Sequence, residues 1–339
     1  RMREELTCTW QTEELPGQRM TGRDEFEHVL FFLTDVIYRV VPVFYEMLEM
    51  ALVKVFGDLT EKIRIPVLIR FGSWVGGDMD GNPNVSAATI RATLASQRQA
   101  ILARYAAELS RLEDVLTQCP SRIKVEDAVF ERCDVYGKAL PEALETIPPR
   151  HRNMPYRILC RLMAARLRAT SEDRSNGYAD AASFLDDLEV IADSLRKNRG
   201  SNAGLFGIRR LAWRVRTFGF HLATLDLRQD ALVHRRVVGR LLGNADWETA
   251  SPTERTRRLR ALLAAPMDPA RDMDAECDSV LDVFTSVAEA RRRYGDEAVG
   301  PYIVSMAQNA DDVLSVLALA RWAGLKRPPT GNVLVMSDA

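Results

Sequence analysis

Four short apolar runs constrain the fold of this chain more than any other feature. They lie at residues 66–71, 222–227, 302–306 and 332–336. Each of the first three is followed by a polar or glycine-containing loop and then by a helical pattern. Periodicity alone does not separate such runs from buried helix, but their length and the loops after them favour strands. The repeated order of strand, loop and helix predicts a parallel α/β element, and in a barrel of this kind the active site lies at the carboxyl ends of the strands.

Most of the remaining chain is predicted to be helical, because apolar residues recur at three- and four-residue spacing. The predicted helices cover residues 23–56, 86–118, 125–146, 155–169, 179–197 and 203–216. Pro42 is expected to kink or divide the first of them, and Ser86 is a candidate N-cap of the second. The sequence therefore predicts a mainly helical chain, with a long helical stretch between residues 86 and 217.

Composition excludes several classes of protein. The 46 Lys and Arg residues balance 47 Asp and Glu residues, so no overall basic field favours nucleic acid or a membrane surface. The five cysteines are widely spaced without a Cys-x-x-Cys pair, which indicates reduced thiols and no disulfide framework or zinc site. The longest apolar stretch, at residues 29–43, is too short and too polar to span a bilayer. With no signal peptide visible either, we expect a soluble, cytoplasmic protein.

The loop after the first predicted strand concentrates the candidate site residues. It reads Phe71-Gly-Ser-Trp-Val-Gly-Gly-Asp-Met-Asp-Gly-Asn-Pro-Asn-Val85. Gly76, Gly77 and Gly81 permit positive φ or close backbone approach, and Trp74 provides a flat, rigid apolar face. A loop of this composition on a rigid scaffold is a candidate for binding or catalysis.

Asp78 and Asp80 of this loop allow two interpretations. They could ligate a hard cation, or they could accept backbone N–H groups and hold the loop in shape. The spacing from Asp78 to Asn82 invites comparison with an EF-hand, which fails because Pro83 occupies the sixth position and Thr89 the twelfth. We favour the structural interpretation of the two carboxylates over direct metal binding.

Arg228, at the carboxyl end of the second predicted strand, is the strongest single candidate for anion binding. Its guanidinium is always charged and offers a planar fork that matches phosphate or carboxylate. The alternative is an ion pair with Asp226 or Asp230. His221 and His234 flank the same strand, and both are expected to be structural.

Four segments resemble signature motifs of phosphoenolpyruvate carboxylase, in the order of that family. Trp74–Pro83 is similar to Trp-Met-Gly-Gly-Asp-Arg-Asp-Gly-Asn-Pro, and Leu225-Asp-Leu-Arg-Gln-Asp230 to Leu-Asp-Ile-Arg-Gln-Glu. Tyr302-Ile-Val-Ser-Met306 resembles Tyr-Val-Ile-Ser-Met, and Trp10-Gln-Thr-Glu-Glu-Leu15 resembles Trp-Gln-Thr-Asp-Glu-Ile. The resemblance extends from about residue 3 to about residue 324.

The resemblance implies a fold and a function. The fold would be part of a (β/α)₈ barrel with large helical insertions, divided into residues 1–85, 86–217 and 218–339. The full-length enzyme would be a cytoplasmic homotetrameric lyase that forms oxaloacetate and phosphate from phosphoenolpyruvate and bicarbonate, feeding the tricarboxylic acid cycle. Its cofactor would be Mg²⁺ or Mn²⁺. The resemblance places Arg228 on the substrate phosphate, and Trp74, Gly77, Asp78 and Asp80 around the substrates.

The chain also departs from the family pattern. Met79 stands where most members carry arginine, which is either a tolerated variant or a mark of weakened chemistry. The family's catalytic histidine and its glycine- and arginine-rich loop have no counterpart, and Asp338 is the one candidate for a metal-binding aspartate. We therefore expect an internal piece of the enzyme that is inactive alone. The alternative is a catalytically inactive relative that serves as a helical binding module or partner subunit.

Overall fold

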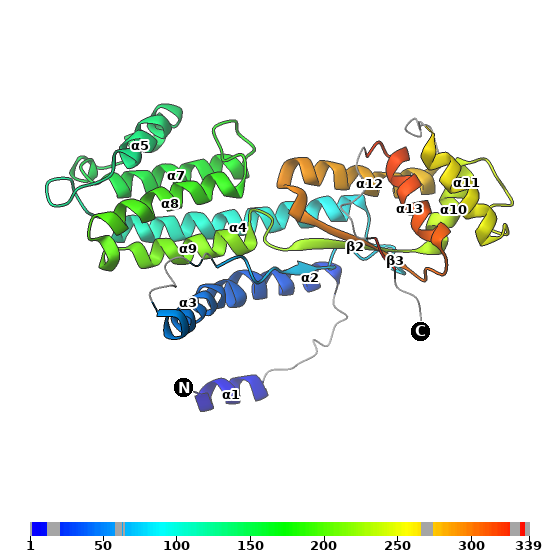
Figure 1. Cartoon of the computed structure of the whole chain (residues 1–339), viewed down its shortest axis with the longest axis horizontal. Coiled ribbons are helices and arrows are strands. Elements are labelled where there is room, and N and C mark those ends of the chain that lie inside the picture. The colour runs from blue at the N-terminus through cyan, green and yellow to red at the C-terminus, as the bar shows by residue number, and fades with distance from the viewer. Residues whose placement is uncertain are drawn as a thin grey trace.

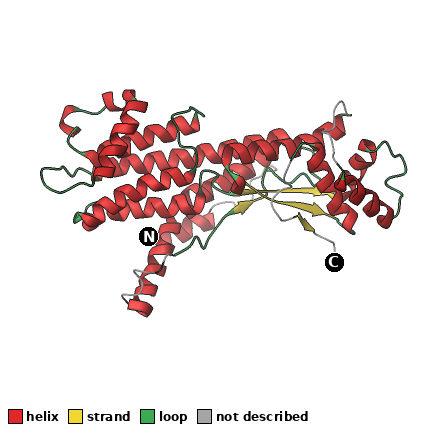
Figure 2. Cartoon of the chain, turned by 45° about the horizontal axis from the view of Figure 1, so that its top comes forward, coloured by secondary structure: helices red, strands yellow, loops and turns green. Residues whose placement is uncertain are grey.

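The protein is mainly helical and is built around one small parallel sheet (Figures 1 and 2). The computed structural model describes residues 2–11, 21–57, 63, 65–265, 274–325 and 333–335. The α-helices are α1 (Met2–Gln11), α2 (Gly22–Phe31), α3 (Tyr38–Phe56), α4 (Ala87–Val115), α5 (Asp127–Ala139), α6 (Pro141–Glu145), α7 (Pro155–Ser171), α8 (Ala181–Lys197), α9 (Leu205–Phe218), α10 (Ala231–Leu241), α11 (Pro252–Ala264), α12 (Ala275–Tyr294) and α13 (Ala310–Trp322). The π-helix η1 (Phe32–Ile37) joins α2 to α3, and the 3-10 turns are η3 (Pro149–His151), η4 (Gly200–Asn202) and η5 (Asp296–Ala298).

The sheet confirms the predicted parallel α/β element. Its strands are β1 (Gly72–Ser73), β2 (Thr224–Asp230), β3 (Val299–Ser305) and β4 (Val333–Val335), and they lie side by side in chain order, all parallel. The carboxyl ends of β1, β2 and β3 therefore meet at one edge. This edge is where the glycine-rich loop and Arg228 come together.

The first strand lies later in the chain than predicted, at Gly72–Ser73 and not at residues 66–71. Residues 66–71 are not part of the sheet, and β1 begins only at Gly72. Pro66 has no N–H to donate, and the N–H of Leu68 donates to the hydroxyl of Tyr45 at 3.0 Å instead of to a strand. The side chain of Tyr45 therefore holds this apolar run against α3. Only at the end of the run does the carbonyl of Phe71 reach β2, where it accepts the N–H of Thr224 at 2.9 Å.

Helix α4 joins two hydrophobic cores. Its N-terminal half packs through Ile90 and Leu94 into a cluster with the sheet and helices α10 to α13. Its C-terminal half packs through Ile101 and Leu109 into a second cluster with α3, α5, α7, α8 and α9. Ser86 caps the helix as predicted, in a reciprocal capping box with Thr89. A single 29-residue helix thus connects the sheet to the helical body (Figure 1).

Pro42 neither breaks nor ends its helix. It lies inside α3, four residues after Tyr38, whose carbonyl oxygen would otherwise accept the missing N–H. The buried Arg214 of α9 donates its Nε to that carbonyl at 3.0 Å and satisfies it. The irregularity predicted for this region lies instead at η1, just before α3.

The helix predicted over residues 125–146 is divided in two, which corrects the sequence prediction. Helix α5 ends at Ala139 and α6 begins at Pro141, with Leu140 outside helical geometry at φ −139° and ψ 58°. Proline disfavours the α region for the residue before it, which explains the break.

The structure also describes the cysteines, the polarity of the helices and two histidines. All five cysteines are free. Across the described part of the chain, every helix is either too short or too polar to traverse a lipid bilayer. His221 and His234 are both largely buried, as expected of structural histidines, and burial lowers the pKa of each to about 4.

The stability of the fold should fall as pH falls, partly because of His234. This side chain is fully buried with its Nε2 at 2.8 Å from the hydroxyl of Tyr302. Its folded-state pKa of about 4 lies below the unfolded value of 6.5, so protons bind the unfolded state preferentially between these values. The neutral histidine therefore contributes up to about 3 kcal/mol above pH 6.5, which is lost as pH falls toward 4.

We expect His234→Gln to flatten the dependence of unfolding free energy on pH between 6.5 and 4, as measured by urea denaturation at several pH values. The exposed His28 provides the matched control, His28→Gln, which should leave the slope unchanged. An unchanged slope in His234→Gln would contradict the assignment.

Candidate functional site at the strand ends

The glycine-rich loop folds back onto the end of β2. The carbonyl of Trp74 accepts the N–H groups of Gly77 at 2.8 Å and Asp78 at 3.0 Å, which turns the chain directly after β1. The N–H of Met79 then donates to the carbonyl of Arg228 at 2.9 Å, and the N–H of Arg228 donates to the carbonyl of Gly77 at 3.1 Å. The loop thereby continues the pairing of β1 with β2 beyond the regular strand.

Two glycines permit this approach. A Cβ at Gly77 would lie 2.2 Å from the carbonyl oxygen of Asp226, so the loop reaches β2 only without a side chain at this position. Gly76 has φ +87°, and a Cβ there would lie 2.2 Å from Oγ1 of Thr93 in α4. Both positions therefore require glycine for close packing. Gly81 has φ +65°, and a Cβ there would have no atom within 4 Å. Glycine is therefore favoured at this position only by the backbone conformation of the turn.

The close approach places both loop aspartates on Arg228. The Nη2 atom of Arg228 donates to Oδ2 of Asp80 at 2.8 Å, and its Nη1 lies 3.5 Å from Oδ2 of Asp78. The ion pairs of Arg228 are therefore with the loop, rather than with Asp226 or Asp230 of its own strand. All three side chains of this cluster are about two-thirds buried or more, so solvent screens their interaction only in part.

Ser305 is a member of the cluster that the sequence analysis did not single out. It is the last residue of β3, it is buried, and its hydroxyl accepts a second hydrogen bond from Nη2 of Arg228 at 3.3 Å. Arg228 pairs with Ile303 in the register of the two strands, so Ser305, two residues further on, lies on the same face. The available signal was its position at the end of a predicted strand, next to Arg228.

The hydrogen bonds leave one end of the guanidinium available. Nη2 carries two hydrogens, which are directed to Asp80 and Ser305. Nη1 makes only the 3.5 Å approach to Asp78, so it can still donate to an incoming oxyanion. The formal charge of Arg228, Asp78 and Asp80 together is −1, so an anion that binds here needs further positive charge close by.

The two aspartates behave as loop acceptors in this structure. Oδ1 of Asp78 accepts the N–H of Asp80 at 3.2 Å, and both carboxylates face Arg228. Among the described residues, no three His, Cys, Asp or Glu side chains come together in a way that could hold a metal ion. Asp338, the other candidate metal ligand, lies outside the described residues.

Met79 points away from the two aspartates. Its side chain is only 8 % exposed and belongs to the hydrophobic cluster of the sheet and the first half of α4. Methionine at this position therefore contributes to the core. The Met79 side chain itself is not part of the polar cluster around Arg228.

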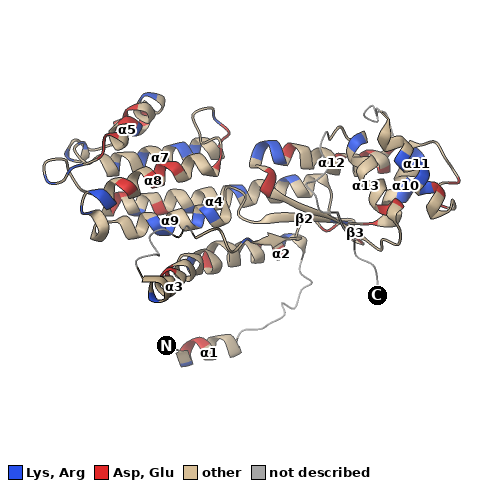
Figure 3. Ribbon diagram, viewed as in Figure 1, with Lys and Arg blue, Asp and Glu red and all other residues tan. Residues whose placement is uncertain are grey.

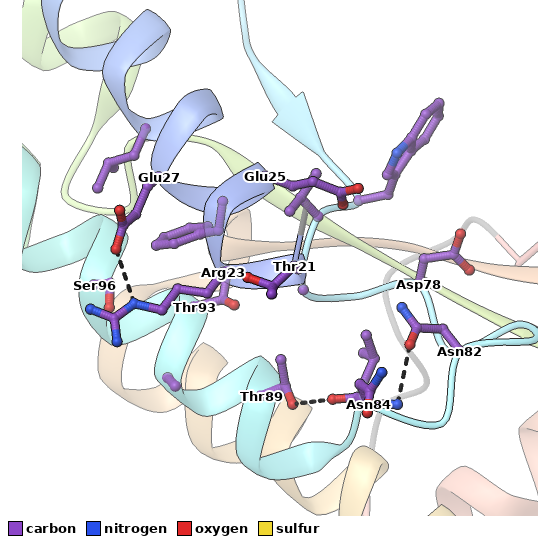
Figure 4. A pocket seen from close by; sticks show the side chains of 18 of the residues that line it. Thr21, Arg23, Glu25, Glu27, Asp78, Asn82, Asn84, Thr89, Thr93 and Ser96 are labelled. Carbon is purple, nitrogen blue, oxygen red and sulfur yellow. Dashed lines mark hydrogen bonds and ion pairs between the residues drawn. The ribbon is translucent and has the colours of Figure 1, made fainter. Parts of the chain in front are cut away.

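A large cleft borders the loop on the side of α2 and α4. Its volume is about 1340 Å³, and its walls are the first turns of α2, the loop from Trp74 to Val85 and one face of α4. Figure 4 shows Asp78 at its edge, Asn82 and Asn84 on the loop, and Arg23 paired with Glu27 on α2. Trp74 lines the cleft and is 65 % exposed, whereas Arg228 and Asp80 are not part of its lining.

The requirement for glycine at position 77 can be tested by comparison with position 81. We expect Gly77→Ala to lower the unfolding free energy by about 3 kcal/mol, because the added methyl group collides with the backbone of β2. Gly81→Ala should cost only about 1 kcal/mol, for its positive φ. Urea denaturation measures both values.

Hydrogen exchange gives a second, local measurement. In Gly77→Ala the N–H groups of Met79 and Arg228 should lose protection, and in Gly81→Ala they should retain it. Equal costs and equal protection in the two variants would contradict the close approach described above.

The family model and the most similar proteins all carry the name of one family. The sequence model of the family described as phosphoenolpyruvate carboxylase matches residues 1–336. A phosphoenolpyruvate carboxylase of Xanthomonas campestris pv. campestris is 48 % identical over 326 residues, which cover 96 % of this chain and 36 % of the relative. The enzymes of the same name from Burkholderia vietnamiensis and Roseiflexus castenholzii are 33 % and 32 % identical, over 96 % and 97 % of this chain and 34 % and 37 % of their own lengths. The chain thus spans about a third of the length of these curated relatives.

Proposed function

The chain belongs to the phosphoenolpyruvate carboxylase family, and from this premise we propose that it forms part of a carboxy-lyase. The reaction would convert phosphoenolpyruvate and bicarbonate into oxaloacetate and phosphate, and would feed the tricarboxylic acid cycle. The chain matches about a third of its relatives' length, and it has no counterpart of the family's catalytic histidine. We therefore expect the 339-residue chain alone to be inactive.

The observation that carries this proposal is the partly free guanidinium at the strand ends. Arg228 projects from the carboxyl end of β2, with Asp80 and Ser305 fixing one side of its fork. The other side, Nη1, makes only the 3.5 Å approach to Asp78 and can still donate to a phosphate oxygen of phosphoenolpyruvate. Because Asp80 and Ser305 hold Arg228 from two different segments, the cation is oriented before the substrate arrives, which limits reorganisation during the reaction.

The other proposed site residues lie in the glycine-rich loop beside Arg228. Gly77 brings the loop onto β2, Asp78 and Asp80 orient Arg228, and Trp74 provides an exposed apolar wall at the cleft. We propose that these residues surround phosphoenolpyruvate and bicarbonate. The alternative is a catalytically inactive relative that serves as a helical binding module or partner subunit. We favour the enzyme, because such a scaffold does not need a partly buried arginine held by two carboxylates at a glycine-dependent turn.

Mg²⁺ or Mn²⁺ is the cofactor implied by the family. The described residues do not fit a complete metal site, since both loop aspartates are directed to Arg228 and no group of three donors is present among them. The net negative cluster nevertheless requires a cation beside an anionic substrate. We propose that the ligands of this metal lie elsewhere in the enzyme.

We further propose that the sheet is part of a (β/α)₈ barrel. Helices α10 and α12 pack against one face of β2 and β3, through Leu225 and Tyr302 among others. The opposite face carries Asp226 and Arg228, which are only partly buried, beside the buried Ser305, although parallel sheets are usually covered on both faces. Such a face suits the interior of a barrel whose other strands lie outside this chain. The three-part division at residues 85 and 217, a cytoplasmic location and a homo-oligomeric assembly are parts of the same proposal.

The role of Arg228 can be tested in the protein expressed from its complete reading frame. We expect Arg228→Gln to raise the apparent Michaelis constant for phosphoenolpyruvate about tenfold or more, because a charge-assisted bond to phosphate is lost. Oxaloacetate formation is followed through its reduction by malate dehydrogenase.

The matched control is Arg70→Gln, which removes an exposed arginine that pairs with Glu297 at the amino ends of β1 and β3, away from the strand ends that carry Arg228. It should leave the Michaelis constant unchanged. An unchanged constant in Arg228→Gln would refute the assignment of Arg228, and absence of oxaloacetate formation in the unmodified protein would refute the proposed reaction itself.

A further inference from the structure

The two hydrophobic cores meet at the middle of α4, beside Arg98. Leu94 packs into the cluster of the sheet and helices α10 to α13, and Ile101, two turns later, packs into the cluster of the helical body. Among the described residues, the two clusters share no buried side chain. In Figure 1, α12 lies along one half of α4 and α7 along the other. A contact that joins α7 to α12 therefore links the two cores across α4.

Arg98 makes this link by bonding to the ends of both helices. Its Nη1 donates to the carbonyl of Arg293 at 3.1 Å, in the last turn of α12, and its Nη2 donates to the carbonyl of Thr170 at 3.3 Å, in the last turn of α7. The last carbonyls of a helix lack partners within the helix and carry a partial negative charge. The Arg98 side chain, only 11 % exposed, also lies over the ring of Tyr294, with 5.3 Å between Cζ and the ring centroid. One guanidinium thus binds two helix ends that belong to different cores.

Asp173 adds a carboxylate to this contact from the turn after α7. Its Oδ1 lies 3.9 Å from Nη2 of Arg98, and its Oδ2 accepts a hydrogen bond from Nη2 of Arg293. Arg293 belongs to the basic end of α12, which Figure 3 shows in blue. The carboxylate therefore lies between two guanidinium groups that would otherwise repel each other.

The backbone conformation of Asp173 supports a role beyond ending the helix. The N–H of Arg174 donates to the carbonyl of Ala169 at 2.8 Å, and the N–H of Asp173 donates to the carbonyl of Thr170 at 3.3 Å, which is the Schellman pattern. Asp173 has φ +52°, at the position where this motif favours glycine. A side chain is held in such a conformation where its surroundings require it. The two ion pairs of the carboxylate account for an aspartate at this position.

We propose that Arg98, Asp173 and the end of α12 form a clamp that makes the two cores open as one cooperative unit. Proteins open locally in cooperative units, whose boundaries lie where few contacts cross. The clamp supplies charged contacts at the boundary between the two clusters. It also keeps the sheet on α4, where Thr93 lies against Gly76 of the glycine-rich loop. The clamp is independent of the chemistry proposed at Arg228.

The test is native-state hydrogen exchange of the 339-residue chain at rising, sub-denaturing urea concentrations, with peptides of α8 and α12 resolved by mass spectrometry. In the unmodified chain, the most protected amides of both helices should reach one common opening constant. In Arg98→Met, the opening constant of α12 should exceed that of α8 at least about tenfold, because two hydrogen bonds from a charged donor are lost. Helix α12 should open first, because one face of its sheet carries the partly buried Asp226 and Arg228.

Asp173→Gly distinguishes the clamp from a local helix end. Glycine is the preferred residue at this position of the motif, so a role confined to ending α7 predicts unchanged or increased protection in this variant. The clamp predicts the opposite result. The opening constant of α12 should rise several-fold over that of α8, because Arg98 and Arg293 lose the carboxylate between them.

The matched control is Arg111→Met, which removes an exposed arginine of the same helix that pairs with Glu108 within α4. This variant should keep a common opening constant for α8 and α12, and circular dichroism should show that all variants are folded. Separate opening of the two helices in the unmodified chain would overturn the proposal. A common opening constant in both Arg98→Met and Asp173→Gly would overturn it as well.

Discussion

The contact between the glycine-rich loop and the end of β2 is the constraint on which the site depends. The reciprocal backbone bonds between Met79, Gly77 and Arg228 form only because residue 77 has no side chain where the carbonyl of Asp226 lies. The same pairing sets the alternation of side chains in the loop. Asp78 and Asp80 face the guanidinium of Arg228, and Met79 between them enters the core. One steric condition thus fixes both the polar cluster and the packing beneath it.

Helix α4 packs against the loop and connects it to the rest of the molecule. Its first turns pack with Met79 and β2, Thr93 lies against Gly76, and its second half belongs to the core of the helical body. A long helix packed at both ends is stiff, because its interior hydrogen bonds are all made within the helix. The loop therefore rests on a rigid support, as preorganised binding groups require.

The net negative charge of the cluster of Arg228, Asp78 and Asp80 limits how well the described residues alone can bind an anion. Arg228 is oriented by Asp78, Asp80 and Ser305, yet the two carboxylates exceed its single positive charge. An anionic substrate gains from Nη1 of Arg228 but is repelled by both aspartates. A substrate as highly charged as phosphoenolpyruvate, which we propose for the whole enzyme, would therefore need more cations than this segment offers. The charge balance also explains how the loop can be ordered without substrate.

The sequence by itself determined the family, the parallel strand–loop–helix order and Arg228 as the leading candidate, since motif spacing and helical periodicity are local properties. The sequence pattern predicted β1 too early, because the bond from Leu68 to Tyr45 is long-range. It predicted α5 and α6 as one helix, because the apolar periodicity continues across the break at Leu140 and Pro141. Only the tertiary structure decided the partners of Arg228, the buried side of Met79 and the inclusion of Ser305. These depend on strand register and on the close approach at Gly77, which join residues about 150 positions apart in the chain and which no local pattern encodes.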